Sequence, residues 1–103
     1  MSFATFINKA AEKDTVVVDV RSPIQRTRNL PGLKDVKVME KPCNSFINDI
    51  VKKERMKDKT LLIFDQVGKQ VKWLMYYMAD KRYTDYYFLR GGVADVLQEQ
   101  EYR

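Results

Sequence analysis

Short, mostly apolar runs divide this chain at regular intervals. Four of them predict β-strands, at residues 16–20, 36–39, 61–64 and 86–89. The first is rich in β-branched residues and shows no alternation of polar and apolar positions. Such a run is typical of a strand that is buried on both faces, as in a parallel sheet.

Between these strands, apolar residues recur at the three- to four-residue spacing of an α-helix. The expected helices lie over about residues 3–12, from a cap at Asn44 or Ser45 onward, over residues 71–82, and from Gly91-Gly92 onward. Ser2 is the expected N-cap of the first helix. In chain order, the inner faces of these four helices are expected to carry the following residues. They are Phe3, Phe6, Ile7, Ala10 and Ala11 on the first helix; Phe46, Ile47, Ile50, Val51 and Met56 on the second; Val71, Leu74, Met75 and Met78 on the third; and Val93, Val96 and Leu97 on the fourth.

Strands that alternate with helices predict an α/β protein, in which right-handed crossovers place helices on both faces of a parallel sheet. The 103 residues are close to the commonest size of a domain. No internal repeat, low-complexity tract or linker-like segment interrupts them. A single domain over residues 1–103 is therefore expected.

Composition narrows the class further. A hydrophobic content of 45% and a charged content of 32% are ordinary for a globular protein. No apolar run approaches the ~20 residues needed to span a bilayer, and the first residues do not have the pattern of a signal peptide. One cysteine excludes an intrachain disulfide, and the lack of histidine argues against a zinc site. We therefore expect a cytoplasmic protein without metal, cofactor or membrane contact.

The formal net charge of +5 raises the question of nucleic-acid binding. Basic and acidic residues are interleaved, however, as in residues 52–59, and this pattern is typical of a solvated helix face. The positive surplus favours acidic protein partners or anionic ligands. Nucleic-acid binding stays open as a weaker alternative.

Four motifs occur in an order that resembles rhodanese-like domains. Residues 18–23 resemble the D-V-R-[ST]-P segment, and residues 29–33 resemble the H-[IL]-P-G-A turn. Residues 65–70 stand at the place of the active-site loop C-Q-S-G-x-R, and residues 89–93 resemble L-x-G-G-[IV]. The resemblance spans about residues 4–97. It implies an α/β/α sandwich around a central parallel sheet of four or five strands.

The chain departs from the family pattern where the chemistry takes place. Rhodaneses carry sulfane sulfur on a cysteine at the first loop position, whereas Asp65 stands there in this chain. Gln70 replaces the common arginine, and Val67 replaces a small hydroxyl residue. A carboxylate cannot hold a transferable sulfur, so the resemblance implies an inactive homologue that serves as a binding or regulatory module, for example in sulfur metabolism or signalling. The candidate ligand-binding residues are Asp65, Gln66, Val67, Gly68, Lys69 and Gln70.

Asp65 allows two interpretations. Its carboxylate can accept hydrogen bonds from the N–H groups of its own loop, or it can act as a nucleophile or base in a weak hydrolase of phosphate or a related anion. The second interpretation lacks the D-x-D pattern of a magnesium site, and Asp19 is the other acidic candidate. Cys43 offers a separate route to sulfurtransferase chemistry, although a lone cysteine is most often a packing residue. Arg21 and Arg90 are candidate residues at the border of the pocket.

Aromatic residues are concentrated in the C-terminal half. Trp73, Tyr76, Tyr77 and Met78 cannot all face inward, because neighbouring positions on a helix are ~100° apart. Some aromatic surface is therefore expected to be exposed, and exposed aromatic patches are common at protein interfaces. This predicts a protein partner or self-association, in addition to a small anion in the loop.

Overall fold

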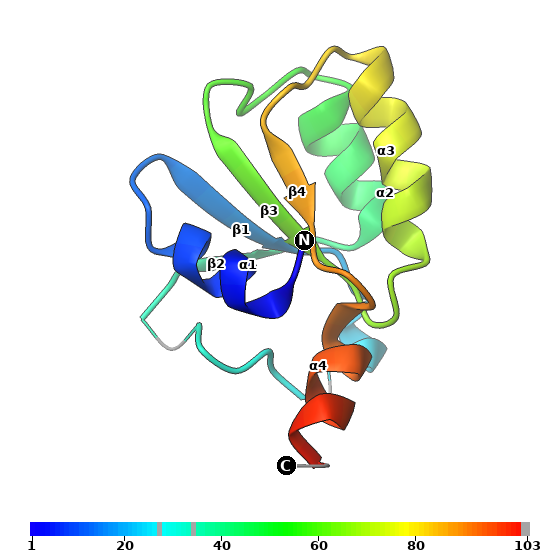
Figure 1. The fold of residues 1–103 in the computed structure, drawn as a ribbon. Coiled ribbons are helices and arrows are strands. Elements are labelled where there is room, and N and C mark those ends of the chain that lie inside the picture. Colours follow the sequence, from blue (N-terminus) through cyan, green and yellow to red (C-terminus); the bar gives the residue numbers. More distant parts are fainter. Residues whose placement is uncertain (27, 34, 102–103) are drawn as a thin grey trace.

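The computed structural model describes residues 1–26, 28–33 and 35–101 of the chain. Its centre is a parallel sheet of four strands in the order β2-β1-β3-β4 (Figure 1). The strands are β1 (Thr15–Asp19), β2 (Val38–Glu40), β3 (Thr60–Phe64) and β4 (Tyr86–Phe88). In register, Val17 is opposite Val38 on one side and Leu62 on the other. The two longest strands, β1 and β3, thus form the middle of the sheet.

Helices cover both faces of the sheet, as Figure 1 shows. Helix α1 (Phe3–Ala10) and helix α4 (Gly92–Glu101) lie on one face. Helix α2 (Cys43–Phe46), its continuation as a π-helix (Ile47–Val51), and helix α3 (Gln70–Asp80) lie on the other. The predicted α/β/α sandwich with a parallel sheet is confirmed.

Alternation along the two central strands explains why their middle residues are all apolar. Val18 and Ile63 point to the side of α2 and α3, where they join one buried cluster. Val17 and Leu62 point to the side of α1 and α4, where they pack with Phe6. Because side chains alternate between the faces of a strand, a strand that is covered on both faces needs apolar residues at every position.

The second helix begins differently from the sequence prediction. It starts at Cys43, after Pro42, and neither Asn44 nor Ser45 caps it. The backbone N–H of Cys43 donates to the carbonyl of Val20 at 3.1 Å, so the end of the first strand satisfies a donor that a capping side chain would otherwise take. The prediction of a cap at Asn44 or Ser45 was wrong because this partner comes from a remote part of the chain.

Smaller differences concern helix ends and inner faces. Ala11, expected on the inner face of the first helix, follows its last residue and is exposed. Met56, expected on the second helix, lies beyond the end of the π-helix at Val51. Helix α1 ends at Ala10 instead of residue 12, and α3 spans Gln70–Asp80 instead of residues 71–82. Met75 was expected on the inner face of α3, but its side chain is 46% exposed. The buried residues of this helix are Val71, Leu74 and Met78. They form a stripe too narrow to include Met75, which lies at its edge. Ser2 does cap α1, as predicted, by accepting from the Thr5 N–H at 3.3 Å.

Candidate functional site

Asp65 stands directly after the central strand β3, in the loop that leads into α3. The carboxyl ends of neighbouring parallel strands meet at this edge of the sheet, which is where α/β proteins commonly bind ligands. The side chain is buried, with an exposed fraction of 1% for the residue. Its Oδ1 accepts from the N–H of Gly68 at 2.6 Å, and its Oδ2 accepts from the N–H of Gln70 at 2.8 Å. Both carboxylate oxygens are thus engaged by the backbone of the loop.

The start of α4 packs against the same loop. The N–H groups of Val93 and Ala94 donate to the carbonyls of Asp65 and Gln66, at 3.0 and 2.9 Å. Gly92 makes this approach sterically possible, since a Cβ at that position would lie 2.6 Å from the Asp65 carbonyl oxygen. Its φ of +67° also favours glycine. The first donors of α4 therefore serve the loop backbone and hold the loop in place.

Arg21 and Asp19 form a buried ion pair at the end of the neighbouring strand. The Arg21 Nε and Nη2 donate to the two carboxylate oxygens of Asp19, at 3.0 and 2.9 Å. The Nη1 donates to the backbone carbonyls of Gln25 and Arg28 and to the Oε1 of Gln66. Arg21 thereby ties strand β1, the segment that follows it and the Asp65 loop together. Its guanidinium anchors structure at the border of the site, and Asp19 is already neutralised.

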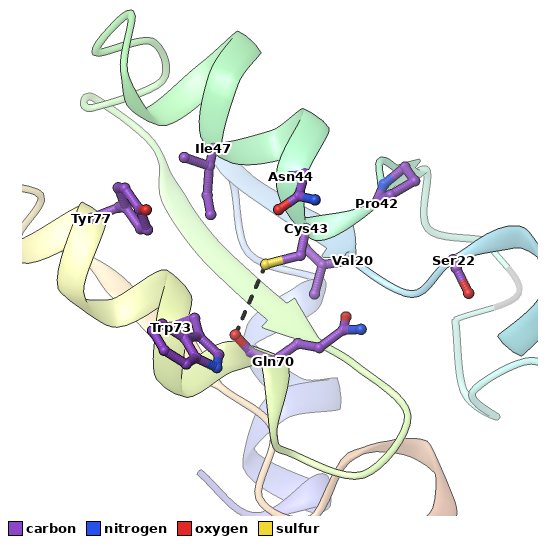
Figure 2. A pocket seen from close by; sticks show the side chains of 9 residues that line it. All are labelled: Val20, Ser22, Pro42, Cys43, Asn44, Ile47, Gln70, Trp73 and Tyr77. Carbon is purple, nitrogen blue, oxygen red and sulfur yellow. Dashed lines mark hydrogen bonds between the residues drawn. The ribbon is translucent and has the colours of Figure 1, made fainter.

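Cys43 lies next to the loop, although it stands 22 positions before Asp65 in the sequence. Its Sγ is 3.9 Å from the carbonyl oxygen of Gln70, and Cys43 lines a pocket of about 350 Å³ between α2 and α3 (Figure 2). Burial raises the pKa of the Cys43 thiol, and the negative charge of Asp65 raises it further. Since the thiolate is the nucleophilic form, this environment opposes a reactive role at neutral pH.

The other predicted site residues lie outside this cluster of contacts. Val67 and Lys69 are exposed on the outer side of the loop. Arg90 is exposed as well, and its backbone N–H donates to the carbonyl of Met1 at 3.0 Å. Of the predicted residues, the structure thus joins Asp65, Gln66, Gly68 and Gln70 in one hydrogen-bonded loop, with Arg21 bound to it.

Sequence reasoning missed the pocket beside the loop. Its lining comes from three places in the chain, namely Val20 and Ser22 after β1, the start of α2 with Cys43, Asn44 and Ile47, and the outer side of α3 with Gln70, Trp73 and Tyr77. The four-residue spacing of Trp73 and Tyr77 was the available signal, because such residues lie on one side of a helix.

Arg26 was also missed. It lies 3.6 Å from a carboxylate oxygen of Asp19 and 3.6 Å from one of Glu40.

Two other kinds of site are absent from the part of the chain that the structure describes. Among those residues, no group of three or more histidine, cysteine, aspartate or glutamate side chains could hold a metal ion. No described helix is long and apolar enough to cross a membrane.

Comparison with known proteins shows likeness in structure and not in sequence. No protein-family model matches the chain, and no curated protein matches it. Among solved structures, a rhodanese-related protein from Thermoplasma volcanium is similar, with a TM-score of 0.71 and 15% identity over 96% of this chain and 90% of that one. A protein of unknown function from Rhodopseudomonas palustris, described as a possible tyrosine phosphatase, gives a TM-score of 0.72 and 17% identity, covering 96% of this chain and 79% of that one.

A third similar structure is a NAD-dependent persulfide reductase from A. fulgidus. It gives a TM-score of 0.60 and 22% identity over 81% of this chain, which corresponds to 14% of that much longer chain. At these identities, the three likenesses establish the fold that the proteins share.

Proposed function

We propose that this chain, which has a rhodanese-like fold, is a binding or regulatory domain without sulfurtransferase activity. The proposal depends on one observation. The carboxylate of Asp65 is buried and accepts hydrogen bonds from the Gly68 and Gln70 N–H groups of its own loop. The resemblance to rhodaneses assigns that position to the sulfur-carrying cysteine.

The arrangement of the loop opposes the transfer reaction for two reasons. Sulfur transfer needs a thiolate that attacks a sulfane sulfur and keeps it as a persulfide, and a carboxylate cannot form that bond. Backbone N–H groups that would stabilise an incoming anion are held by Asp65 instead. A second anion would have to compete with an internal one and would be repelled by it.

The first test is a thiosulfate:cyanide sulfurtransferase assay of the native chain and of two variants. We expect the native chain and Asp65→Asn to form thiocyanate at the background rate. Asp65→Cys is expected to form it measurably above background, because the loop still presents its N–H groups to a thiolate. Far-UV circular dichroism of each variant verifies that the fold is retained.

A sulfurtransferase that uses Cys43 is the second candidate, and the place of Cys43 beside the loop favours it. The raised pKa of the Cys43 thiol opposes it. Native turnover that Cys43→Ser abolishes would establish this candidate and overturn the inactive domain. A hydrolase that uses Asp65 has less support, since both carboxylate oxygens are already bound to the backbone.

A further inference from the structure

Helix α3 turns three aromatic side chains toward solvent. Trp73 is 69% exposed, Tyr76 74% and Tyr77 41%. They lie on the sides of the helix that face away from its buried stripe. Isolated exposed apolar residues are ordinary, whereas neighbouring large aromatic residues commonly mark a surface that another molecule covers.

The pocket beside the Asp65 loop opens next to these aromatic residues. Trp73 and Tyr77, one helical turn apart, form its α3 wall, and Cys43 and Ile47 belong to the opposite wall (Figure 2). Val20, which is fully buried, also lines it. The pocket of about 350 Å³ is open to solvent on one side and is large enough to receive an apolar side chain.

Three lysines surround the aromatic residues. Lys69 and Lys72 are exposed at the start of α3, one turn before Trp73 and Tyr76 respectively. The Lys52 Nζ lies 5.9 Å from the centroid of the Tyr77 ring. None of the carboxylates in the described part of the chain forms a salt bridge with these lysines. We call the six residues Lys52, Lys69, Lys72, Trp73, Tyr76 and Tyr77 the α3 patch.

Nearby acidic residues do not neutralise the α3 patch. Asp49, on the adjacent helix, pairs with Lys41 at 3.0 Å, and Glu54 pairs with Lys57 at 2.7 Å. Asp65 is buried beneath the start of α3. Asp80 is exposed, but it stands at the opposite end of α3 from Lys69 and Lys72. The patch therefore presents positive charge beside a pocket that is lined by both apolar and polar side chains.

We propose that the α3 patch binds an acidic segment of a partner protein, which inserts one apolar side chain into the pocket. This inference rests on the proposed function and names the partner class of the binding domain. Positive charge on the patch complements acidic residues on the segment, and the aromatic side chains provide large, rigid contact area. Among the described residues, the buried Oε1 of Gln70, a residue that lines the pocket, has no hydrogen-bond partner.

Two other occupants fit the patch less well. A second copy of the chain, packed face to face, would bring Lys52, Lys69 and Lys72 of both copies together and would be repelled. A nucleic acid would match the charge, and its bases could stack on the aromatic rings. Three lysines, however, are few for a surface that must follow a phosphate backbone, because affinity for nucleic acid rises with the number of phosphates that are neutralised.

The test is a selection from a phage library of random dodecapeptides on the immobilised native chain. We expect the selected peptides to be rich in aspartate and glutamate around an aliphatic or aromatic residue. Because Trp73 is the sole tryptophan, its fluorescence should change when a selected peptide binds. Fluorescence polarisation of a labelled peptide then compares the variants. Trp73→Ala should weaken binding by about 30-fold, as for a central interface residue. Lys72→Glu should weaken it by about five- to tenfold and should reduce its salt dependence.

Matched controls lie on other surfaces of the molecule. Tyr87 is an exposed aromatic residue on β4, with the Lys9 Nζ 5.1 Å from its ring centroid, so Tyr87→Ala removes a comparable aromatic–lysine pair. Lys13→Glu, on the turn after α1, makes the same change in net charge as Lys72→Glu. Both control variants should bind the selected peptide with the native affinity.

Several outcomes would overturn this inference. One is a selection that yields no peptide, or peptides without acidic enrichment. Another is binding that Trp73→Ala leaves intact. If an oligothymidylate binds more tightly than the selected peptide, and Trp73→Ala abolishes that binding, the surface would be assigned to nucleic acid. A dimer in sedimentation equilibrium that Trp73→Ala dissociates would assign it to a second copy. The sulfurtransferase assay is independent of the peptide selection. Turnover by the native chain would overturn the proposed function, whereas a failed selection would overturn only the inference that the α3 patch binds an acidic segment.

Discussion

At the scale of single residues, Asp65 acts on its loop much as an N-cap residue acts on a helix. Lys69, which precedes α3, makes no capping hydrogen bond with its side chain, while Asp65 accepts from the first N–H of that helix, at Gln70. Internal capping of this kind was one of the two interpretations of Asp65 that the sequence allowed. The residue type and its place after a strand were visible in the sequence, whereas the donors were not. A buried carboxylate needs such partners, because without them its desolvation is strongly unfavourable.

The same carboxylate influences Cys43, and this can be measured. The pKa of the Cys43 thiol is raised by burial and by the charge of Asp65, so the thiol should be largely protonated at neutral pH. We expect its alkylation by iodoacetamide at pH 7 to be slower than in the same chain unfolded in urea. The native rate should continue to rise with pH beyond the point at which the rate of the unfolded chain levels off.

Asp65→Asn should raise the native alkylation rate of Cys43 by about two- to fivefold, because it removes the negative charge that is one of the two causes of the raised thiol pKa. Burial, the larger cause, remains in this variant. Asp58→Asn, an exposed residue in the loop before β3, is the matched control and should leave the rate unchanged. A native thiol that is alkylated faster than the unfolded one would contradict this account of Cys43.

At the scale of secondary-structure elements, two glycines in the site have different steric surroundings. Both have positive φ, +84° for Gly68 and +67° for Gly92. A Cβ on Gly68 would meet Gly91 Cα at 3.5 Å, which is ordinary contact. A Cβ on Gly92 would lie 2.6 Å from the Asp65 carbonyl oxygen and 2.7 Å from the Gln66 carbonyl carbon. The contact between α4 and the loop therefore has no room for a side chain at Gly92.

These surroundings predict unequal costs for the two alanine substitutions. Gly68→Ala should lower the free energy of unfolding by about 1 kcal/mol, the usual cost of a left-handed conformation in a residue with a side chain. Gly92→Ala should lower it by a further ~2 kcal/mol or more, because two backbone segments must move apart. Urea unfolding followed by far-UV circular dichroism measures both. Equal costs would show that the contact between α4 and the loop is looser than the structure indicates.

The elements themselves were largely predictable, because each depends on short-range patterns. All four strands and all four helices occur where the apolar spacing placed them, with ends that differ by a few residues. The start of α2 was not predictable, since its first N–H bonds to Val20, far away in the sequence. The exposure of Met75 was missed for a related reason. The width of the buried stripe on α3 depends on how closely the neighbouring helix packs against it.

At the scale of the whole molecule, the two faces of the sheet hold separate apolar clusters, and Trp73 belongs to neither. Phe6 is fully buried on the α1 side, where its ring meets that of Phe64 edge to face with centroids 6.1 Å apart. The sole tryptophan, by contrast, stands on the surface. Aromatic content alone would not have separated these two roles.

This difference predicts how two large-to-small substitutions affect stability. Phe6→Ala should lower the free energy of unfolding by about 3–5 kcal/mol, because it leaves a cavity in the core. Trp73→Ala should change it by no more than ~0.5 kcal/mol, as is usual for surface positions. Far-UV circular dichroism in urea measures both. Native tryptophan emission should already resemble that of tryptophan in water, and a strongly blue-shifted native emission would contradict the exposure of Trp73.

The sequence by itself determined the fold class and the absence of a cysteine from the Asp65 position. Both are local properties, because apolar periodicity sets each element and the residue type sets the available chemistry. Only the tertiary structure decided that Cys43 lies beside Gln70, that Arg21 is bound by Asp19 and the loop, and that a pocket opens next to Trp73 and Tyr77. These contacts join segments that are far apart in the chain, so they depend on how the helices pack across the sheet.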